Sequence, residues 1–249
     1  MIDLHTHTRY SDGKATPEEM VLAALRKGLA EIGISDHAYT FFDESYCIKK
    51  QDIPRYKAEI AELKRKYDGQ IIVKCGVEQD LFSTEPTEGF DYAIGSLHYL
   101  KKGGTYYPLD CSKKDFLLLA EAEFGGDYYA LAEEYFSLVS AYAERKDVWV
   151  VGHFDLITKY NEGNVLFDET DPRFLTPALR AADALFAAGK IFEINTGAIA
   201  RGYRTEPYPG KAILSHLKQK GAKFLLSSDA HSPDNIAFAF DKFAESALQ

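Results

Sequence analysis

Histidine and acidic residues recur in short motifs along the whole chain, and their side chains are of the types that hold divalent metal ions. Nine residues stand out: His5, His7, Asp12, His37, Glu78, His98, His153, Asp229 and His231. Imidazole and carboxylate ligands without cysteine suit zinc, manganese or iron and are typical of catalytic sites. Because one tetrahedral ion needs about four ligands, these nine donors predict two or three ions.

These residues lie at or just beyond the ends of predicted β-strands, so residues far apart in the sequence can meet. Apolar, β-branched runs predict strands at 1–5, 31–36, 71–78, 92–98, 148–153, 191–195 and 223–229. The carboxyl ends of parallel strands surround one common site, where we expect the side chains to converge. His5 and His7 share a face because residues i and i+2 of a strand point the same way.

The number of histidines at the strand ends argues against ordinary core packing, because burying six titratable rings around one point without metal costs free energy of desolvation. Six of the seven histidines lie at these strand ends. The remaining one, His216, lies inside a predicted helix and is interpreted as a packed residue without a metal. Metal coordination is therefore the favoured interpretation for the other six.

Amphipathic helices alternate with the strands. They are predicted at 17–27, 52–68, 127–146, 173–188, 209–220 and 233–249. Thr16, Pro17 and Glu19 form a capping box with proline at the first helical position, and Gly28 ends that helix. This alternation predicts an α/β fold with parallel strands, a slightly undersized (β/α)7 barrel formed by a single domain over 1–249. A doubly wound open sheet is the alternative.

One segment, 99–127, departs from this rhythm. It is about twice as long as a usual connection and is rich in tyrosine, glycine and lysine. A functional insertion or lid is one interpretation. A disordered surface loop is the other, because the segment contains the tetrapeptide KKGG.

The composition is that of an ordinary globular protein, and its charge argues against some partners. The net charge of −9 disfavours nucleic acid and anionic membranes. The sequence lacks both a run of roughly 18 apolar residues and a signal-peptide pattern, so we expect a cytoplasmic protein. Cys47, Cys75 and Cys111 are odd in number and widely spaced, which predicts reduced thiols. Nothing in the sequence indicates an oligomeric state.

The ordered motifs resemble those of the PHP superfamily. They are LHTHTRYSDG at 4–13, ISDH at 34–37, GVEQD at 76–80, IGSLH at 94–98, GHFD at 152–155 and SSDAH at 227–231. IGSLHYL and the segment FEINTGAIARGYRTEPYP at 192–209 look like the histidinol-phosphate phosphatases within that superfamily. The resemblance covers essentially the whole chain and implies a distorted (β/α)7 barrel with a trinuclear metal centre.

The resemblance also implies how three ions are held. His5, His7, Glu78 and Asp229 would hold the first, and Glu78 would bridge to a second held with His98 and His153. The third would be held by Asp12, His37 and His231, and Asp12 stands where many relatives carry a histidine. The implied reaction is hydrolysis of a phosphate monoester, L-histidinol phosphate, by a metal-bridging hydroxide.

Residues near the strand ends supply candidates for substrate binding and proton transfer. Arg201 and Arg204 follow the sixth strand and are predicted to bind phosphate, with Asn195 beside them; solvated loop arginines are the alternative. Asp229 and His231 are candidates for the leaving-group acid, and Arg201 is also placed in the catalytic set. Substrate-binding residues are also predicted after the second strand, where an acidic, aromatic loop could instead pack on the barrel rim: Tyr39, Phe42 and Asp43.

Three other functions share part of this signature. Another PHP-type phosphoesterase, acting on a different small phosphomonoester or a nucleotide, would keep the same ligands. An amidohydrolase-type deaminase would need a carboxylated lysine at a strand end, and Lys74 lies inside the third strand instead. A non-enzymatic, metal-stabilised module is disfavoured by the complete ligand set.

Overall fold

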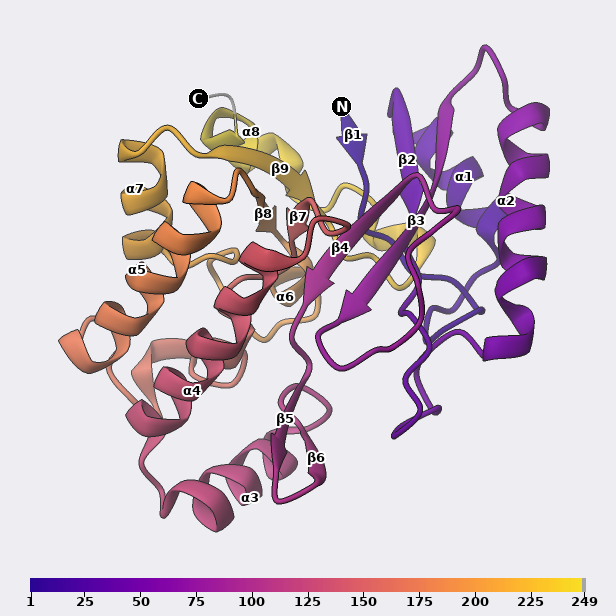
Figure 1. Ribbon diagram of the computed structural model, residues 1–249. Helices are drawn as coiled ribbons and strands as arrows, with labels where there is room; N and C mark the ends of the chain where they lie inside the picture. The colour runs from indigo at the N-terminus through magenta and orange to yellow at the C-terminus, as the bar shows by residue number, and fades with distance from the viewer. Residues whose placement is uncertain (248–249) are drawn as a thin grey trace.

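Seven parallel strands surround a common axis in the computed structural model, which describes the backbone of residues 1–247 (Figure 1). They are β1 (Ile2–Asp3), β2 (Glu31–Ile34), β3 (Ile72–Asp80), β4 (Tyr92–Ser96), β7 (Val150–Val151), β8 (Ile191–Asn195) and β9 (Lys223–Ser227). Their order in the sheet follows their order in the chain. All seven predicted strands are therefore present.

Main-chain hydrogen bonds beyond the strand ends join the last strand to the first. The Ala230 carbonyl accepts from the His7 amide at 2.9 Å, and the Ala230 amide donates to the His5 carbonyl at 3.2 Å. These contacts close the sheet into a barrel, so the open doubly wound alternative is wrong. The predicted (β/α)7 fold class is confirmed, whereas the single-domain organisation over 1–249 stays a prediction.

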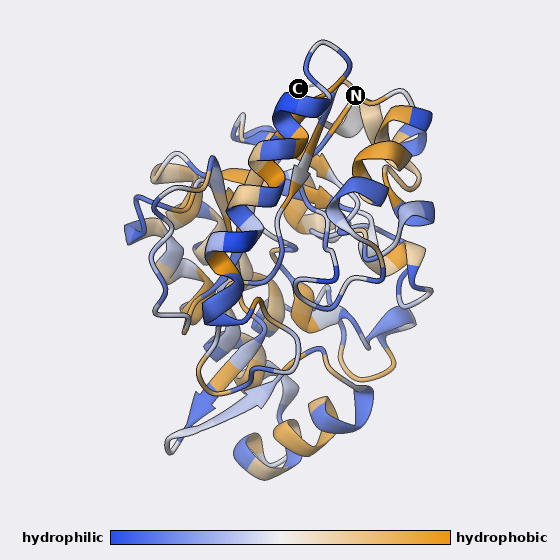
Figure 2. Cartoon of the chain, turned by 90° about the vertical axis from the view of Figure 1, so that its right-hand side faces the viewer, coloured by the Kyte–Doolittle hydropathy of each residue, from blue (hydrophilic) through white to orange (hydrophobic). Residues whose placement is uncertain are grey.

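Helices cover the outside of the barrel. In Figure 1, α1 (Pro17–Arg26) and α2 (Ile53–Lys66) lie on one side, and α4 (Tyr128–Ser140), α5 (Pro172–Ala187) and α7 (Lys211–Gln219) lie on the other. Figure 2 views the molecule from the α1–α2 side and shows hydrophilic and hydrophobic segments alternating along the helices. No helix within 1–247 is long and apolar enough to cross a membrane.

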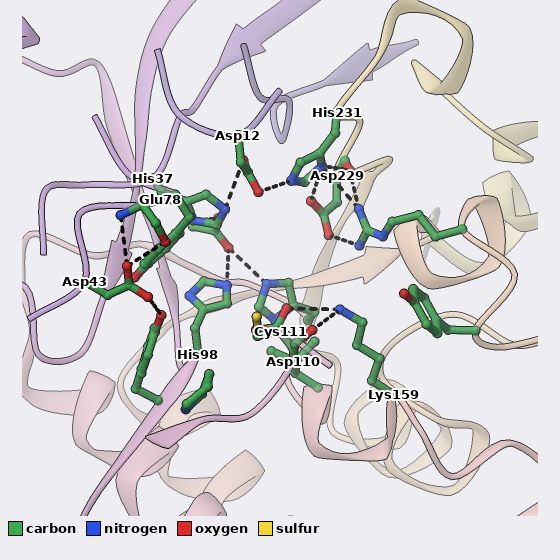
Figure 3. A pocket seen from close by; sticks show the side chains of 18 residues that line it. Asp12, His37, Asp43, Glu78, His98, Asp110, Cys111, Lys159, Asp229 and His231 are labelled. Carbon is green, nitrogen blue, oxygen red and sulfur yellow. Dashed lines mark hydrogen bonds and ion pairs between the residues drawn. The ribbon is translucent and has the colours of Figure 1, made fainter. Parts of the chain in front are cut away.

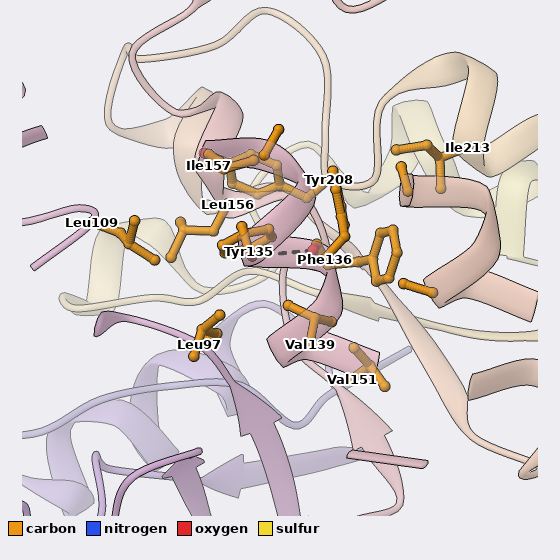
Figure 4. Close-up of a cluster of buried hydrophobic side chains, with 14 of the residues drawn as sticks. Leu97, Leu109, Tyr135, Phe136, Val139, Val151, Leu156, Ile157, Tyr208 and Ile213 are labelled. Atoms are coloured by element: carbon orange, nitrogen blue, oxygen red, sulfur yellow. Dashed lines mark hydrogen bonds between the residues drawn. The ribbon is translucent and has the colours of Figure 1, made fainter. Parts of the chain in front are cut away.

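Regularly spaced apolar residues attach these helices to the strands. On α2 the buried side chains are Tyr56, Ile60 and Leu63, which share one helical face because they are three or four positions apart. On α4, Phe136 and Val139 belong to the same buried cluster as Val151 of β7 (Figure 4). Each half of the barrel thus has its own apolar layer between helices and sheet.

Tyr92 fills the amino-terminal end of the barrel interior, below the histidines. Its side chain lies against Gly33 and Gly76, where an added Cβ would come within 1.9 Å of the Tyr92 hydroxyl oxygen and 2.2 Å of a ring carbon, respectively. Only glycine on β2 and β3 permits this approach. The Tyr92 hydroxyl donates to the Leu4 carbonyl and thereby ties β4 to the segment that leads to His5.

The segment 99–127 is a hairpin followed by a helix rather than an irregular loop. The strands β5 (Tyr99–Lys102) and β6 (Thr105–Pro108) pair around Gly103 and Gly104, and Ser112 caps α3 (Lys113–Phe124). In Figure 1 both elements lie beyond the carboxyl ends of β3 and β4. The interpretation as a disordered loop is therefore wrong, and the helix was missed.

Two further differences concern the C-terminal third. The short α6 (Gly197–Ala200) was not predicted. The helix predicted over 233–249 is instead a 3-10 turn at Pro233–Asn235 followed by α8 (Phe240–Ala247), and residues 248–249 lie outside the described part. Tertiary contacts explain the break: the Ala237 amide, at φ 51°, donates to Asp3, and Thr196 donates to the Phe238 carbonyl.

Candidate metal centre

The strand ends bring all nine candidate ligands to one place, around the carboxylate of Glu78. Its Oε1 lies 2.9 Å from His153 Nε2, 3.3 Å from His5 Nε2 and 3.4 Å from His98 Nε2. Its Oε2 lies 2.8 Å from His37 Nδ1 and 3.5 Å from His7 Nε2. One buried carboxylate therefore faces five imidazoles from the ends of four strands, β1, β2, β4 and β7, a position suited to bridging ions.

The ligand atoms form three overlapping groups. Each group has all its donor atoms within 4.8 Å of one another: His5, His7 and Asp229; His37, Glu78 and His98; and His7, Asp12, His37 and His231. This grouping resembles the three implied ligand sets, although it places both His7 and His37 in two groups and does not include His153. The assignment of each residue to one ion stays a prediction.

Asp12 contributes to the most exposed group. Its Oδ2 lies 3.1 Å from His231 Nε2, and its Oδ1 lies 3.6 Å from His37 Nε2. The turn that carries Asp12 is held by Asp36, which accepts hydrogen bonds from the Thr8 amide and hydroxyl at 2.7 Å each. An aspartate at this position therefore reaches the place where the motif resemblance implies a third set of ligands.

Several buried ligand atoms of this cluster are unsatisfied by the protein itself. Within residues 1–247, His5 Nε2 and both ring nitrogens of His7 make no hydrogen bond. Glu78 Oε2 also makes none, because its 2.8 Å contact with His37 Nδ1 is an ion pair without hydrogen-bond alignment. Buried polar atoms without a partner cost about 1–3 kcal/mol each. Divalent ions would satisfy them, so the residues present fit the metal centre that the motifs imply.

The pKa shifts are those of a site built to hold cations. Burial raises the pKa of Glu78, but the surrounding imidazoles outweigh burial and lower it well below the ordinary value. Burial and two neighbouring imidazoles lower the pKa of His7 to about 3. At neutral pH, Glu78 is thus a carboxylate and His7 a neutral imidazole, which are the forms that ligate metal.

Other histidines hold protons when no metal is bound. Burial lowers the pKa of His5, but the carboxylates of Glu193, Glu78 and Asp229 outweigh it and raise the pKa well above its ordinary range. The pKa of His98 is likewise raised, against burial, by Glu78. Protons and metal ions therefore compete for these two rings.

A pocket of about 320 Å³ opens onto the cluster, and seven of the nine ligands line it (Figure 3). His5 and His7 lie deeper and are fully buried. The other lining residues come from the loop after β2, the hairpin segment and the loops after β7 and β8: Asp43, Ser45, Tyr46, Tyr99, Pro108, Asp110, Cys111, Leu156, Lys159, Arg201 and Tyr203. The segment 99–127 thus forms one wall of the site.

Arg201 is the predicted arginine that the structure places in this pocket. Its Nη2 donates to Asp229 Oδ2 at 2.8 Å, and its Nη1 donates to the Asp229 carbonyl at 3.0 Å. The same Nη1 lies 3.2 Å from His231 Nδ1. The guanidinium is therefore positioned at the edge of the metal cluster, where an anion would sit.

Arg204 lies elsewhere, and its predicted role in phosphate binding is not supported. Its Nη1 and Nη2 donate to the two carboxylate oxygens of Glu169 at 2.6 Å and 3.0 Å, and Nη1 also donates to the Thr158 carbonyl. The side chain is buried and does not line the pocket. Its donors are used to join two loops.

Three predicted substrate-binding residues also lie outside the pocket lining. Asn195 is fully buried and hydrogen-bonds Glu193 and the Gly197 amide. The Tyr39 hydroxyl donates to Glu44, and Phe42 stacks on Tyr106. The alternative interpretation, an aromatic loop packed on the barrel rim, therefore describes Tyr39 and Phe42, whereas Asp43 does line the pocket.

Sequence reasoning missed several polar residues of the site. Lys159 donates to the Asp110 carbonyl at 2.7 Å and lies 3.2 Å from its carboxylate, and both line the pocket. Glu193 on β8 contacts His5, and Asp80 accepts from the His98 amide. The signal for Glu193 was its position two residues before Asn195, which points it into the barrel.

Two residues weighed for other roles lie away from the site. Lys74 borders a cavity lined by residues at the amino-terminal ends of the strands, opposite the metal cluster, so it does not bridge ions as a carboxylated lysine would. His216 lies on α7 with its Nε2 2.7 Å from Asp183, as expected for a residue without a metal. The deaminase interpretation loses its required ligand.

Comparison with known proteins agrees with the motifs. The family model described as the PHP domain matches residues 3–197. A Deinococcus radiodurans protein named "Probable histidinol-phosphatase" is 30% identical over 96% of this chain and 90% of its own length. The histidinol-phosphatase of Bacillus subtilis is 26% identical over 98% of each chain.

The fold is shared with a solved structure. Histidinol phosphate phosphatase from Lactococcus lactis, determined with zinc, L-histidinol and phosphate, superimposes with a TM-score of 0.73 at 21% identity. The alignment covers 100% of this chain and 94% of that one. This likeness shows that the two chains share the barrel architecture.

Proposed function

The chain belongs to the PHP domain family, and from that membership and the geometry of the site we propose that it hydrolyses L-histidinol phosphate to L-histidinol and phosphate. Full-length relatives bear the name histidinol-phosphatase. The single observation that carries the proposal is the Glu78-centred cluster at the base of a pocket. The same pocket is lined by the cationic side chains of Arg201 and Lys159 and by the carboxylates of Asp43 and Asp110. The enzyme is thus a metal-dependent phosphoric monoester hydrolase.

The nine ligands would hold up to three divalent ions, zinc, manganese or iron. The proposed sets are the implied ones, with Glu78 between the first two and Asp12 in the third. Such ions supply acidified water and positive charge that screens the phosphoryl group. Unpartnered buried atoms of His5, His7 and Glu78 support this assignment within 1–247.

Two protein cations are proposed to bind the phosphoryl oxygens. Arg201 presents its guanidinium beside Asp229, and Lys159 lines the same pocket. An arginine fork matches two phosphoryl oxygens, whereas lysine acts as a point charge. The positive charge needed by an anionic substrate is therefore local, in a chain whose net charge is −9.

The histidinol part of the substrate carries an ammonium and an imidazole group. Asp43 and Asp110 are the pocket carboxylates that can accept from these groups, and Tyr46 and Tyr99 supply aromatic surface beside them. Tyr46 and Tyr99 therefore take the substrate-binding role that the sequence had suggested for Tyr39 and Phe42. Because an unpaired ammonium is costly to desolvate, these acids favour this substrate over esters without a positive charge.

The roles of Asp229 and His231 in proton transfer are proposed from the charge state of Asp229. Burial raises the pKa of Asp229, but Arg201 and His5 outweigh burial and lower it well below the ordinary value. Asp229 is therefore ionised at neutral pH and can accept a proton rather than donate one. His231 is the other candidate for the proton donor to the leaving group. Its Nδ1 lies 2.9 Å from the Asp229 carbonyl, and we assign it this role only when its Nε2 is not used by the third ion. We further propose that the enzyme works in the cytoplasm on a small metabolite, without nucleic acid or membrane.

A comparison of substrates tests the proposal. The kcat/KM of metal-loaded protein is expected to be roughly 100-fold higher for L-histidinol phosphate than for p-nitrophenyl phosphate or a nucleoside monophosphate, because contacts to the ammonium and imidazole lower the transition-state energy. Equal rates for all these esters would identify a phosphoesterase with another substrate. Absence of phosphate release from every ester would refute a phosphatase.

A further inference from the structure

Glu193 is a fully buried carboxylate that contacts two candidate metal ligands. It lies on β8, and its Oε1 is 2.7 Å from His5 Nδ1. Its Oε2 accepts from the main-chain amide of His153 at 3.0 Å and from Asn195 Nδ2 at 3.0 Å. His5 and His153 belong to the first and the second implied metal set, so one side chain joins both.

The contact with His5 fixes which ring nitrogen is free. A carboxylate accepts hydrogen bonds only, so Nδ1 of His5 must carry the proton that it donates to Glu193. Once the ring has lost its second proton to bind metal, the lone pair is on Nε2, which lies 3.3 Å from Glu78 Oε1 and 3.9 Å from Asp229 Oδ1. This is the orientation in which outer carboxylates hold ligating histidines.

The contact with His153 positions the second ligand through its backbone. β7 is only two residues long, and the next residue, Gly152, lies close to Glu193. A Cβ at Gly152 would lie 3.5 Å from Glu193 Oε2 and 2.2 Å from Ser96 Oγ. The hydrogen bond to the His153 amide thus fixes the chain at the point where the ring turns towards Glu78, 2.9 Å away.

We propose that Glu193 is a positioning residue that orients His5 and His153 together, so that the first two metal sites form as one unit. The inference rests on the metal-dependent function proposed above. It predicts that a defect at Glu193 weakens two ions at once, although Glu193 itself ligates neither. Orientation by a partner outside the ligand shell typically contributes 10- to 100-fold to metal affinity.

Glu193→Gln tests this proposal because the amide has the same shape but one acceptor and one donor end. If its oxygen accepts from His5, its NH2 group meets the His153 N–H, and two donors face each other. If the amide is flipped, its NH2 group donates to His5 Nδ1 and moves the ring proton to Nε2, the ligating nitrogen. Either orientation loses one ligand.

The experiment measures zinc affinity by competition with a chelator and the His5 tautomer by ¹⁵N NMR of the imidazole nitrogens. E193Q is expected to bind the first two zinc ions roughly 10- to 100-fold more weakly, with a changed tautomer at His5 or a displaced His153. Glu193→Asp keeps the charge but is one methylene shorter, so it can keep only one contact. Its zinc affinity is expected to lie between those of the wild type and E193Q. E193D also serves if E193Q does not fold.

Tyr92→Phe is the matched control. It deletes one buried hydrogen bond, from the Tyr92 hydroxyl to the carbonyl of Leu4, next to His5, and touches no ligand. Y92F is expected to lower Tm but to leave zinc affinity within about twofold of wild type. Wild-type affinity and tautomer in both Glu193 variants would overturn the proposal, as would equal weakening by Y92F. Wild-type protein that binds no zinc would instead contradict the proposed function.

Discussion

Arg201 contacts Asp229 and is also the side chain proposed to bind the substrate phosphate. Its guanidinium donates to the carboxylate and the carbonyl of Asp229, and one edge borders the pocket. Burial lowers the pKa of Arg201, but Asp229 outweighs burial and raises it, so the group stays charged throughout the accessible pH range. It can therefore bind a phosphoryl oxygen while it holds the metal ligand in place.

Arg201→Ala is expected to reduce kcat/KM for L-histidinol phosphate by a factor of about 30 to 1000, because one charge-assisted contact to the transition state contributes roughly 2–4 kcal/mol. Arg201→Lys should recover only part of the loss, since a point charge cannot reproduce the fork. Kinetics and metal content of the same preparations check this. Arg204→Ala is the control: it breaks the ion pair with Glu169 and should lower Tm more than kcat/KM. A kcat/KM of R201A within twofold of the wild-type value would show that Arg201 does not bind the phosphate.

Metal binding is expected to depend on pH through the histidines. The raised pKa values of His5 and His98 mean that both rings carry protons at pH 7 in metal-free protein, and these protons must leave before an ion binds. The affinity for zinc should therefore rise as the pH is raised from 7 towards the pKa values of these two rings. At pH 7, about two protons should be released from the two rings when zinc binds. Calorimetric titration with zinc in buffers of different ionisation enthalpy counts them. An enthalpy that is the same in every buffer would show that the rings are already neutral.

At the scale of residues, the sequence predicted the clustering of histidines and carboxylates better than the lining of the pocket. Strand-end histidines are recognisable because strand direction and period fix where they point. Lys159 and Asp110 were missed because the contact between them joins two loops of irregular course. Arg204 lies three residues after Arg201 with the same charge, and only the presence of Glu169 on another loop separates their roles.

At the scale of elements, the loop after β2 and the β5–β6 hairpin form one wall of the pocket together. Phe42 stacks on Tyr106 at 3.9 Å between ring centroids, and Asp43 accepts from the Tyr99 hydroxyl at 2.6 Å. The hairpin turns at two glycines, Gly103 and Gly104, a signal that local sequence can supply. The packing of the hairpin on a loop some sixty residues earlier was not predictable, because no periodicity links the two segments.

Phe42→Ala is expected to raise KM for L-histidinol phosphate roughly 3- to 10-fold with a smaller change in kcat, because an aromatic pair contributes about 0.5–1.5 kcal/mol beyond its burial. The residue lies outside the pocket lining and acts by holding Asp43 and Tyr99 in position. Steady-state kinetics of F42A measure the effect. Phe41→Ala is the matched control, since Phe41 is 53% exposed and should change KM less than twofold. An equal rise in KM for F42A and F41A would show that the packing of Phe42 on Tyr106 does not hold the pocket residues in position.

At the scale of the whole molecule, the barrel was predictable and its fine closure was not. Alternating strands and helices indicate the (β/α)7 architecture, whereas the joining of β1 to β9 depends on main-chain bonds at Thr6 and Ala230 beyond the strands. The break before α8 depends on Asp3, more than two hundred residues away. Both features arise from tertiary contacts that override local preference.

The whole molecule also has a charge balance that depends on metal. The chain carries −9, and three doubly charged ions would bring it to −3. That change would fall at the base of one pocket, where the substrate phosphate is proposed to bind. Substrate attraction and catalysis are therefore expected to appear together as the ions are loaded.

The most direct test of the account is a titration of metal-free protein with zinc or manganese, with phosphate release from L-histidinol phosphate measured at each equivalent. The metal-free protein is expected to show no turnover. Activity is expected to return only as more than one equivalent of metal binds, because Glu78 is proposed to join the ligand sets of two ions. Full activity in protein verified to be free of metal would contradict the account.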